Sequence, residues 1–256
     1  MTDFPRTAFI LGAGLGTRLR PLTEHCPKPL LRLGDEPLVF RAMRALHQAG
    51  TRRFLINTHH CPEAWTQAFP DGKFLEAEVR LIHEPTLLET GGGLANVAGL
   101  LTEQDRDLVV WNGDILSGVD LAAAVGHHRA NGAEATLVVR EHGPVKNVRI
   151  TDEGDVTDLR DRLGATDPAY QYTGICIVTR AFALGVPKEI ESLVEHFLRR
   201  LAASRGSVQG YLDSSKLWHD LGTVEEFEKM RAELARPVRG RLSVEEAAGL
   251  VGYLPV

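Results

Sequence analysis

The residues best suited to chemistry gather in a glycine-rich segment near the start of the chain. An apolar run ends at Leu11, and glycines follow at positions 12, 14 and 16. Because glycine has no Cβ, it lets backbone N–H groups approach a phosphate closely and adopts positive φ at little cost. Arg18, Arg20 and Lys28 follow, and their charges suit the neutralisation of a triphosphate. The segment therefore predicts a nucleoside triphosphate site.

Two better-known phosphate-binding patterns do not fit this segment. The dinucleotide fingerprint requires a third glycine where Thr17 stands, and the chain continues through Pro21 instead of opening directly into a helix. The P-loop pattern requires a lysine close to the glycines and followed by Ser or Thr, whereas Lys28 lies downstream and is followed by Pro29. The remaining alternative is a turn-rich connection with incidental charge, but packing gives no reason to gather basic residues there.

Two aspartates follow apolar runs further along the chain. Asp114 ends the segment Asn112-Gly113-Asp114, and Asp220 precedes a glycine turn and a helical segment. A carboxylate at the carboxyl end of a strand in an open α/β sheet is well placed to hold a divalent cation beside phosphates. The alternatives are a local turn at Asp114 and a helix cap at Asp220, for which Thr223 is better placed. The pair predicts one Mg²⁺ shared by two carboxylates and substrate phosphates.

Three consecutive glycines, Gly91 to Gly93, open a segment with helical periodicity. Each glycine in a helix is unfavourable by up to about 1 kcal/mol relative to alanine. This choice is understandable if a flat ligand, such as a nucleobase or a ribose, lies against the bare backbone. A close contact between helix and sheet is the alternative, and we expect it to need only one glycine.

The elements that position these residues alternate between strands and helices in the first half of the chain. Apolar helical faces are expected over 39–49, 94–101 and 121–128. Such alternation predicts an α/β fold with a mainly parallel sheet and helices on both faces, which binds ligands at the carboxyl ends of its strands. The glycine-rich segment, 84–93 and 112–114 should therefore converge on one crevice. The expected strands are Thr7–Leu11, Arg53–Asn57, Val79–His83, Leu108–Asn112 and Ala135–Val139.

The pattern changes after about residue 140. A hairpin is expected around Asp152-Glu153-Gly154, then strands over 170–178, 208–212 and 217–220, and helices over 190–201 and 224–234. Residues 1–235 are therefore interpreted as one domain and 236–256 as a short C-terminal extension, in which Ser243 could cap one short helix.

Composition is that of an ordinary globular protein. The chain has 256 residues, 43% of them hydrophobic, a formal net charge of −5, and three widely spaced cysteines. These values suggest neither a nucleic-acid nor a membrane partner, and reduced thiols favour a cytoplasmic protein. No apolar run approaches the roughly 20 residues of a membrane span, and the first residues do not resemble a signal peptide. We expect a monomer or a small homo-oligomer.

Taken together, these motifs resemble those of the sugar-1-phosphate nucleotidylyltransferases. The similarity rests on the opening segment Leu11 to Thr23 with Pro27-Lys28-Pro29-Leu30, on Asn112-Gly113-Asp114 and on Asp220-Leu221-Gly222-Thr223. It covers roughly residues 6 to 234 and implies a Rossmann-like, GT-A-like single domain. It also implies Mg²⁺-dependent transfer of a nucleotidyl group from an NTP to a sugar 1-phosphate. A non-catalytic nucleotide-sugar-binding regulator on the same fold is an alternative, but it would be expected to lack one of the charged motif residues.

The resemblance implies roles for individual residues. Arg18, on the departing phosphates, and Lys28 would be catalytic, and Asp114 with Asp220 would ligate Mg²⁺. The sugar phosphate would meet Lys28, Asp114, Asn147, Arg160 and Gly174. The nucleotide would meet Leu11, Gly12, Ala13, Gly14, Gly16, Thr17, Arg18, Glu84, Gly91, Gly92 and Asn112.

The resemblance also bears on substrate specificity. The run Glu89-Thr90-Gly91-Gly92-Gly93 and the compact length resemble the short bacterial uridylyltransferases that act on N-acetylmuramate 1-phosphate. We therefore expect UTP to exceed GTP in kcat/KM by at least about tenfold. GTP-dependent mannose- or heptose-1-phosphate guanylyltransferases are the alternative. Many members carry Glu-Lys-Pro after the central hairpin, whereas this chain has Asp158 to Arg162 there. Arg160 or Lys146 could replace the lysine, and the glutamate has no evident counterpart.

Overall fold

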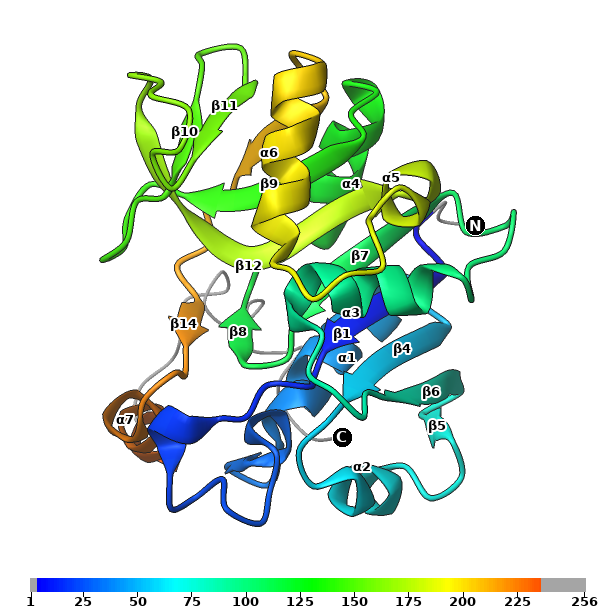
Figure 1. Ribbon diagram of the computed structural model, residues 1–256. Helices are drawn as coiled ribbons and strands as arrows, with labels where there is room; N and C mark the ends of the chain where they lie inside the picture. Colours follow the sequence, from blue (N-terminus) through cyan, green and yellow to red (C-terminus); the bar gives the residue numbers. More distant parts are fainter. Residues whose placement is uncertain (1–3, 236–256) are drawn as a thin grey trace.

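Four parallel strands form the first part of the central sheet (Figure 1). The computed structural model describes residues 4–235. In it, β1 (Thr7–Leu11) lies between β4 (Arg53–Thr58) and β7 (Asp107–Asn112), and β6 (Ala77–His83) flanks β4. β1, β4 and β7 are almost continuously buried, as expected for parallel strands that are covered on both faces. The predicted parallel sheet is confirmed here.

The second part of the chain extends the same sheet with mostly antiparallel pairs. The long strand β12 (Ala169–Thr179) pairs antiparallel with β7, β9 (Ala135–Arg140) and β10 (Val148–Ile150). β13 (Val208–Leu212) lies parallel to β9, and β11 (Val156–Leu159) forms the predicted hairpin with β10. A short strand, β5 (Lys73–Phe74), ends the order β11-β10-β12-β7-β1-β4-β6-β5.

Helices cover both faces of the sheet and divide the core in two. α3 (Glu89–Ala98), α5 (Arg180–Leu184) and α6 (Leu193–Ala203) pack with Phe9 on one face. α1 (Leu38–Ala49), α2 (Pro62–Ala68) and α4 (Leu121–Ala130) pack with Ile10 on the other. Because successive strand residues point to opposite faces, β1 contributes to both cores.

A smaller apolar cluster supports the loops at the carboxyl ends of the strands. α7 (Val224–Ala235) packs there with the hairpin of β2 (Arg32–Leu33) and β3 (Glu36–Pro37). Two short 3₁₀ helices, η1 (Thr17–Leu19) and η2 (Lys28–Leu30), lie in the glycine-rich segment and after it. β14 (Trp218–Asp220) pairs outside the main sheet with β8 (Ile115–Ser117), which brings Asp220 opposite Ile115. The segment 236–256, with the helix expected after Ser243, lies outside the described residues.

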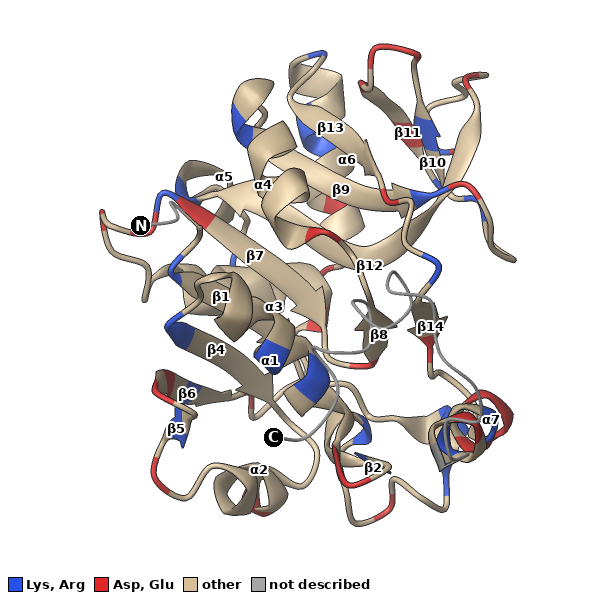
Figure 2. Ribbon diagram, turned by 180° about the vertical axis from the view of Figure 1, so that it is seen from behind, with Lys and Arg blue, Asp and Glu red and all other residues tan. Residues whose placement is uncertain are grey.

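None of the helices between residues 4 and 235 combines the length and the hydropathy that crossing a membrane requires. Basic and acidic residues are interspersed over the ribbon rather than gathered on one face (Figure 2).

Candidate active site

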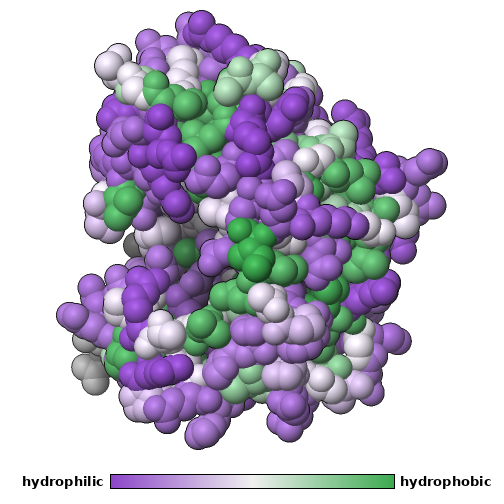
Figure 3. All heavy atoms as spheres, in the orientation of Figure 1, coloured by the Kyte–Doolittle hydropathy of each residue, from purple (hydrophilic) through white to green (hydrophobic). Residues whose placement is uncertain are grey.

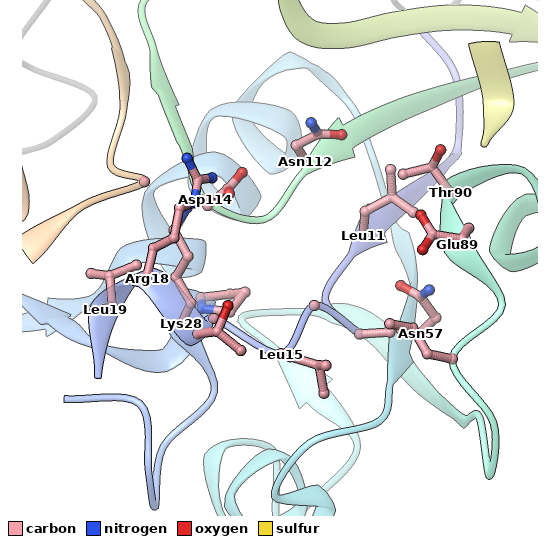
Figure 4. Close-up of a pocket in the computed structure, with 17 residues that line it drawn as sticks. Leu11, Leu15, Arg18, Leu19, Lys28, Asn57, Glu89, Thr90, Asn112 and Asp114 are labelled. Atoms are coloured by element: carbon pink, nitrogen blue, oxygen red, sulfur yellow. Dashed lines mark hydrogen bonds and ion pairs between the residues drawn. The ribbon is translucent and has the colours of Figure 1, made fainter. Parts of the chain in front are cut away.

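A cleft of about 360 Å³ lies where the sequence predicts one, at the carboxyl ends of β1, β4 and β7. The space-filling view shows the surface hollowed between the part that carries β10 and β11 and the part that carries α7 (Figure 3). The cleft is lined by Leu11, Ala13, Gly14, Leu15, Gly16, Thr17, Arg18, Leu19, Lys28, Pro29, Asn57, Leu87, Glu89, Thr90, Asn112, Asp114 and Gly222. In the close-up, Arg18, Lys28 and Asp114 gather at one end, and Asn57, Glu89 and Thr90 lie at the other (Figure 4).

The three glycines of the first segment differ in their surroundings. A Cβ on Gly12 would stand 2.8 Å from the Asn57 carbonyl oxygen and 2.8 Å from the Trp65 ring, so packing requires this glycine. Gly16 has φ +62° and lies against Thr23, whose hydroxyl donates to the Gly16 carbonyl at 2.8 Å. A Cβ on Gly14 would meet nothing within 4 Å. Of the three, Gly14 is the one whose missing side chain leaves open space at the cleft.

Lys28 is the buried cation of the site. η2 starts at Lys28, whose side chain is only 8% exposed, and its ammonium hydrogen-bonds to the Asp114 carboxylate. The Asp220 Oδ1 atom lies 3.7 Å from the same ammonium. Partial burial, and then the neighbouring Asp114 carboxylate, raise the pKa of Asp220 above its ordinary value, while Lys28 and Arg18 oppose that rise. The structure thus brings together the predicted residues Arg18, Lys28, Asp114 and Asp220.

Two carboxylates that converge on one cation suit Mg²⁺. Lys28 Nζ stands between Asp114 and Asp220, so these two side chains are already aimed at a shared positive charge. The part of the chain that the structure describes holds no group of three or more His, Cys, Asp or Glu side chains placed for a metal. Mg²⁺ is commonly held by one or two carboxylates together with substrate phosphates, and the donor set at Asp114 and Asp220 fits that mode.

Glu84, which the resemblance places against the nucleotide, is enclosed by groups of the protein itself. It is fully buried after β6, and it accepts a hydrogen bond from Asn57 Nδ2 at 2.9 Å and one from the Leu88 N–H at 3.2 Å. Asn57 Oδ1 in turn accepts from the Gly12 N–H at 2.8 Å. Glu84 therefore orients Asn57 and the start of the glycine-rich segment from behind the cleft.

The glycines at positions 91 to 93 are also explained by protein contacts. A Cβ on Gly91 or Gly92 would stand 2.8 Å from the Glu191 carbonyl oxygen or 2.3 Å from that of Glu189. A Cβ on Gly93 would stand 2.8 Å from Asn57 Nδ2. All three are buried, and neither Gly91 nor Gly92 lines the cleft. Each glycine therefore has its own close neighbour, which corrects our expectation that a close contact would need only one glycine. The contact of a flat ligand with this backbone stays a prediction.

Two of the predicted sugar-binding residues line a second cavity of about 220 Å³, whereas Lys28 and Asp114 line the cleft. Asn147 and Arg160 line this second cavity together with Tyr172 and Phe197. The second cavity shares Leu11, Glu89, Thr90 and Asn112 with the cleft, so the two are neighbours. Gly174 lines neither cavity, and its φ of +83° and its approach to the Asn112 side chain explain its residue type.

Sequence reasoning assigned no site role to Asn57, and it used Glu89 only as part of the run Glu89–Gly93, yet both residues line the cleft. Asn57 ends an expected strand and pairs with Leu11 in register, so the rule that drew attention to Asn112 also applied to it. Glu89 is distinguished by its backbone, since a φ of +62° is unusual for a residue with a side chain. No sequence pattern predicts this conformation.

The sequence comparisons agree with this geometry. The profile of the family described as Nucleotidyl transferase matches residues 7–236. The chain belongs to that family. Mannose-1-phosphate guanylyltransferase of Mycobacterium tuberculosis is 34% identical over 240 residues, which cover 90% of this chain and 65% of the relative. UTP–glucose-1-phosphate uridylyltransferase of Synechocystis is 32% identical over 142 residues, which cover 52% of this chain and 37% of the relative.

A structural comparison supports the same fold. A putative glucose-1-phosphate thymidylyltransferase from Bacillus anthracis, solved with a sucrose, superposes with a TM-score of 0.76 at 17% identity. The match covers 92% of this chain and 98% of that structure, so the GT-A-like architecture expected from the sequence is confirmed. The chain spans less than two thirds of the length of the first curated relatives.

Proposed function

We propose that this member of the nucleotidyl transferase family is an enzyme that joins a nucleoside triphosphate to a sugar 1-phosphate and releases pyrophosphate. The observation that carries the proposal is the polarity of the cleft: its cations, Arg18 and Lys28, lie at one end beside Asp114, and no cation among the described residues lines its other end, toward Asn57, Glu89 and Thr90. A triphosphate suits the first end and a nucleoside the second.

The chain's own residues account for the reaction by position and charge. The sugar phosphate oxygen is already anionic near neutral pH, so it attacks the α-phosphorus without a strong general base. Arg18 stabilises the departing pyrophosphate, and Lys28 neutralises charge at the reacting phosphate. Mg²⁺ held by Asp114 and Asp220 would add charge neutralisation at the phosphates. Asn112 lies at the edge that the cleft shares with the second cavity, where the sugar would bind beside Asn147 and Arg160.

We propose GTP as the donor and a mannose-type hexose 1-phosphate as the acceptor. The support is the mycobacterial relative, a mannose-1-phosphate guanylyltransferase, whose similarity extends over 90% of this chain. This choice departs from the UTP preference that the Glu89–Gly93 run favoured. The glycines of that run have packing reasons of their own, which weakens their value as a mark of uracil recognition. UTP with N-acetylmuramate 1-phosphate remains the second candidate because the run itself resembles those enzymes.

A matrix of substrates tests both candidates. Each NTP is incubated with Mg²⁺ and with mannose 1-phosphate, glucose 1-phosphate, a heptose 1-phosphate or N-acetylmuramate 1-phosphate, and pyrophosphate release is measured. GTP with mannose 1-phosphate is expected to give the highest kcat/KM, by about tenfold over UTP with the same sugar. UTP with N-acetylmuramate 1-phosphate as the best pair would select the second candidate. Pyrophosphate release from no pair would contradict the reaction itself.

A further inference from the structure

Glu89 occupies the junction of the cleft and the second cavity, and neither the fold nor the proposed chemistry uses it. It is the first residue of α3 and lines both cavities, and its side chain is exposed at the end of the cleft opposite Arg18 and Lys28 (Figure 4). No hydrogen bond or ion pair joins the Glu89 carboxylate to another residue between 4 and 235. A full negative charge therefore faces the space between the two cavities.

The backbone presents this side chain at a conformational cost. Glu89 has φ +62°, in the left-handed region that favours glycine. A residue with a side chain stays there only when its surroundings fix the backbone, and such residues concentrate at functional sites. Hydrogen bonds pin both sides of Glu89. Leu88 N–H donates to Glu84 at 3.2 Å, Gly91 N–H to the Glu191 carbonyl at 2.8 Å, and Thr90 Oγ1 accepts from the Leu193 N–H at 2.8 Å.

The charge of Glu89 restricts what it can bind. A carboxylate repels phosphates, and the cations that attract phosphates lie at the other end of the cleft. Among the groups that a nucleoside triphosphate and a sugar 1-phosphate offer, its partners are then uncharged donors, and two carboxylate oxygens match two donors on adjacent atoms.

We propose that Glu89 is a specificity-determining residue that accepts hydrogen bonds from a vicinal diol of the substrates. The inference rests on the proposed function, which supplies two such groups: the ribose of the nucleotide and the hydroxyls of the sugar 1-phosphate. Both would reach the junction, because one ligand occupies each cavity and Glu89 borders both.

Two substitutions separate the effect of the Glu89 carboxylate from the effect of its positive φ. Glu89→Gly removes the carboxylate and relieves the positive φ, so its thermal midpoint should equal or exceed that of the wild type. Glu89→Gln keeps one acceptor oxygen. Leu75→Gly is the matched control, because Leu75 also has positive φ (+51°), is 50% exposed and lies on the β5–β6 turn away from the cleft.

The expected result is a kinetic loss without a loss of stability. Glu89→Gly should raise the KM of one substrate by at least about tenfold, Glu89→Gln by less, and Leu75→Gly should leave both KM values unchanged. If the diol is the ribose, 2′-deoxy-GTP should be a poorer donor than GTP for the wild type, and this penalty should vanish in Glu89→Gly. If the diol belongs to the sugar, the KM of the sugar 1-phosphate rises and the deoxynucleotide penalty stays.

Several outcomes would overturn the inference. Unchanged KM values for both substrates in Glu89→Gly would assign Glu89 no part in recognition. A higher KM for the nucleotide with an undiminished deoxynucleotide penalty would mean that the carboxylate meets the base and not a diol. If the wild type releases no pyrophosphate, the proposed function fails. The role of Glu89 in recognition is then tested by calorimetry, as the affinity of the wild type and of Glu89→Gly for GTP and for mannose 1-phosphate. Equal affinities for wild type and Glu89→Gly, or no binding to either, then overturn the inference.

Discussion

At the scale of single residues, Lys28 sets the electrostatics of the cleft. Its ammonium is buried and is shared by Asp114 and Asp220, whose side chains are 29% and 46% exposed. Removing one partner of a fully buried pair costs about 3–5 kcal/mol, and the exposure of these carboxylates reduces that figure. The same lysine would meet the reacting phosphates, so its loss should be felt more in catalysis than in stability.

Lys28→Ala tests this balance. We expect kcat/KM to fall by roughly a hundredfold or more for both substrates, which corresponds to about 3 kcal/mol of transition-state stabilisation, while the protein stays folded. Pyrophosphate-release kinetics and thermal unfolding measure the two effects. Lys73→Ala removes an exposed lysine on β5 and should change neither. An unchanged kcat/KM in Lys28→Ala would remove this lysine from the reaction.

Gly14 and Gly12 offer a second contrast at this scale. Gly14→Ala places a methyl group in open space, so stability should change by no more than about 0.5 kcal/mol while the KM of the nucleotide rises. Gly12→Ala forces a Cβ against the Asn57 carbonyl and the Trp65 ring, so it should lower the thermal midpoint. If Gly14→Ala leaves the KM of the nucleotide unchanged, phosphates do not lie against this position.

At the scale of secondary-structure elements, the start of α3 depends on its glycines. Gly92→Ala would put a Cβ 2.3 Å from the Glu189 carbonyl oxygen, so α3 and the segment before α6 would have to move apart. We expect a loss of about 1–3 kcal/mol in the free energy of unfolding. Gly126→Ala in α4 is the control, since its Cβ meets nothing within 4 Å and alanine is favoured in helices by up to about 1 kcal/mol. Denaturant titration distinguishes the two, and equal effects would contradict the steric argument.

The sequence predicted the regular elements well because their cause is local. β1, for example, covers Thr7–Leu11 as predicted, since a short apolar run between polar residues can be read directly. The short pairs β2–β3 and β8–β14 lie outside the main sheet, and sequence reasoning anticipated only the strand that became β14. β8 pairs with a strand that is distant in sequence, and β2 and β3 are two residues each, too short for an alternating pattern to be recognised.

The candidate site was predicted as a location but not in all its details. Strand ends located Asn112 and the glycine-rich segment at one edge of the sheet, and the structure brings them together. Glu84 also follows a strand, yet its carboxylate turns inward to Asn57 and the Leu88 N–H. The sequence shows from which strand end a side chain starts, but not whether its hydrogen-bonding atoms are already paired with neighbouring residues. Three glycines in a row likewise do not reveal three separate contacts.

At the scale of the whole molecule, Asp213 links stability to pH. It is buried after β13, and it accepts from the Ser215 N–H at 3.0 Å while its other oxygen has no hydrogen-bond partner among the described residues. Burial raises its pKa above the ordinary 3.8, with Asp120 adding to the rise and Ser215 and Arg140 opposing it. The folded protein therefore binds this proton more tightly than the unfolded chain, and the contribution to stability is lost as pH rises through the window above 3.8.

Asp213→Asn should remove that dependence. The variant keeps the acceptor for Ser215 and carries no charge, so its stability relative to the wild type should increase between about pH 4 and pH 7. Denaturant midpoints measured for both proteins across this range check the prediction. Parallel pH profiles would show that Asp213 ionises as readily in the folded protein as in the unfolded chain.

The shared border of the two cavities has a consequence for ligand affinity. A molecule whose two halves are covalently joined loses its translational freedom once, and when one half is bound, the other is held at a high effective concentration over its own cavity. Since Leu11, Glu89, Thr90 and Asn112 border both cavities, no gap has to be spanned between the halves. A nucleotide sugar should therefore bind more tightly than the nucleoside monophosphate or the sugar 1-phosphate alone, so the protein would retain its own product unless that product is drawn off.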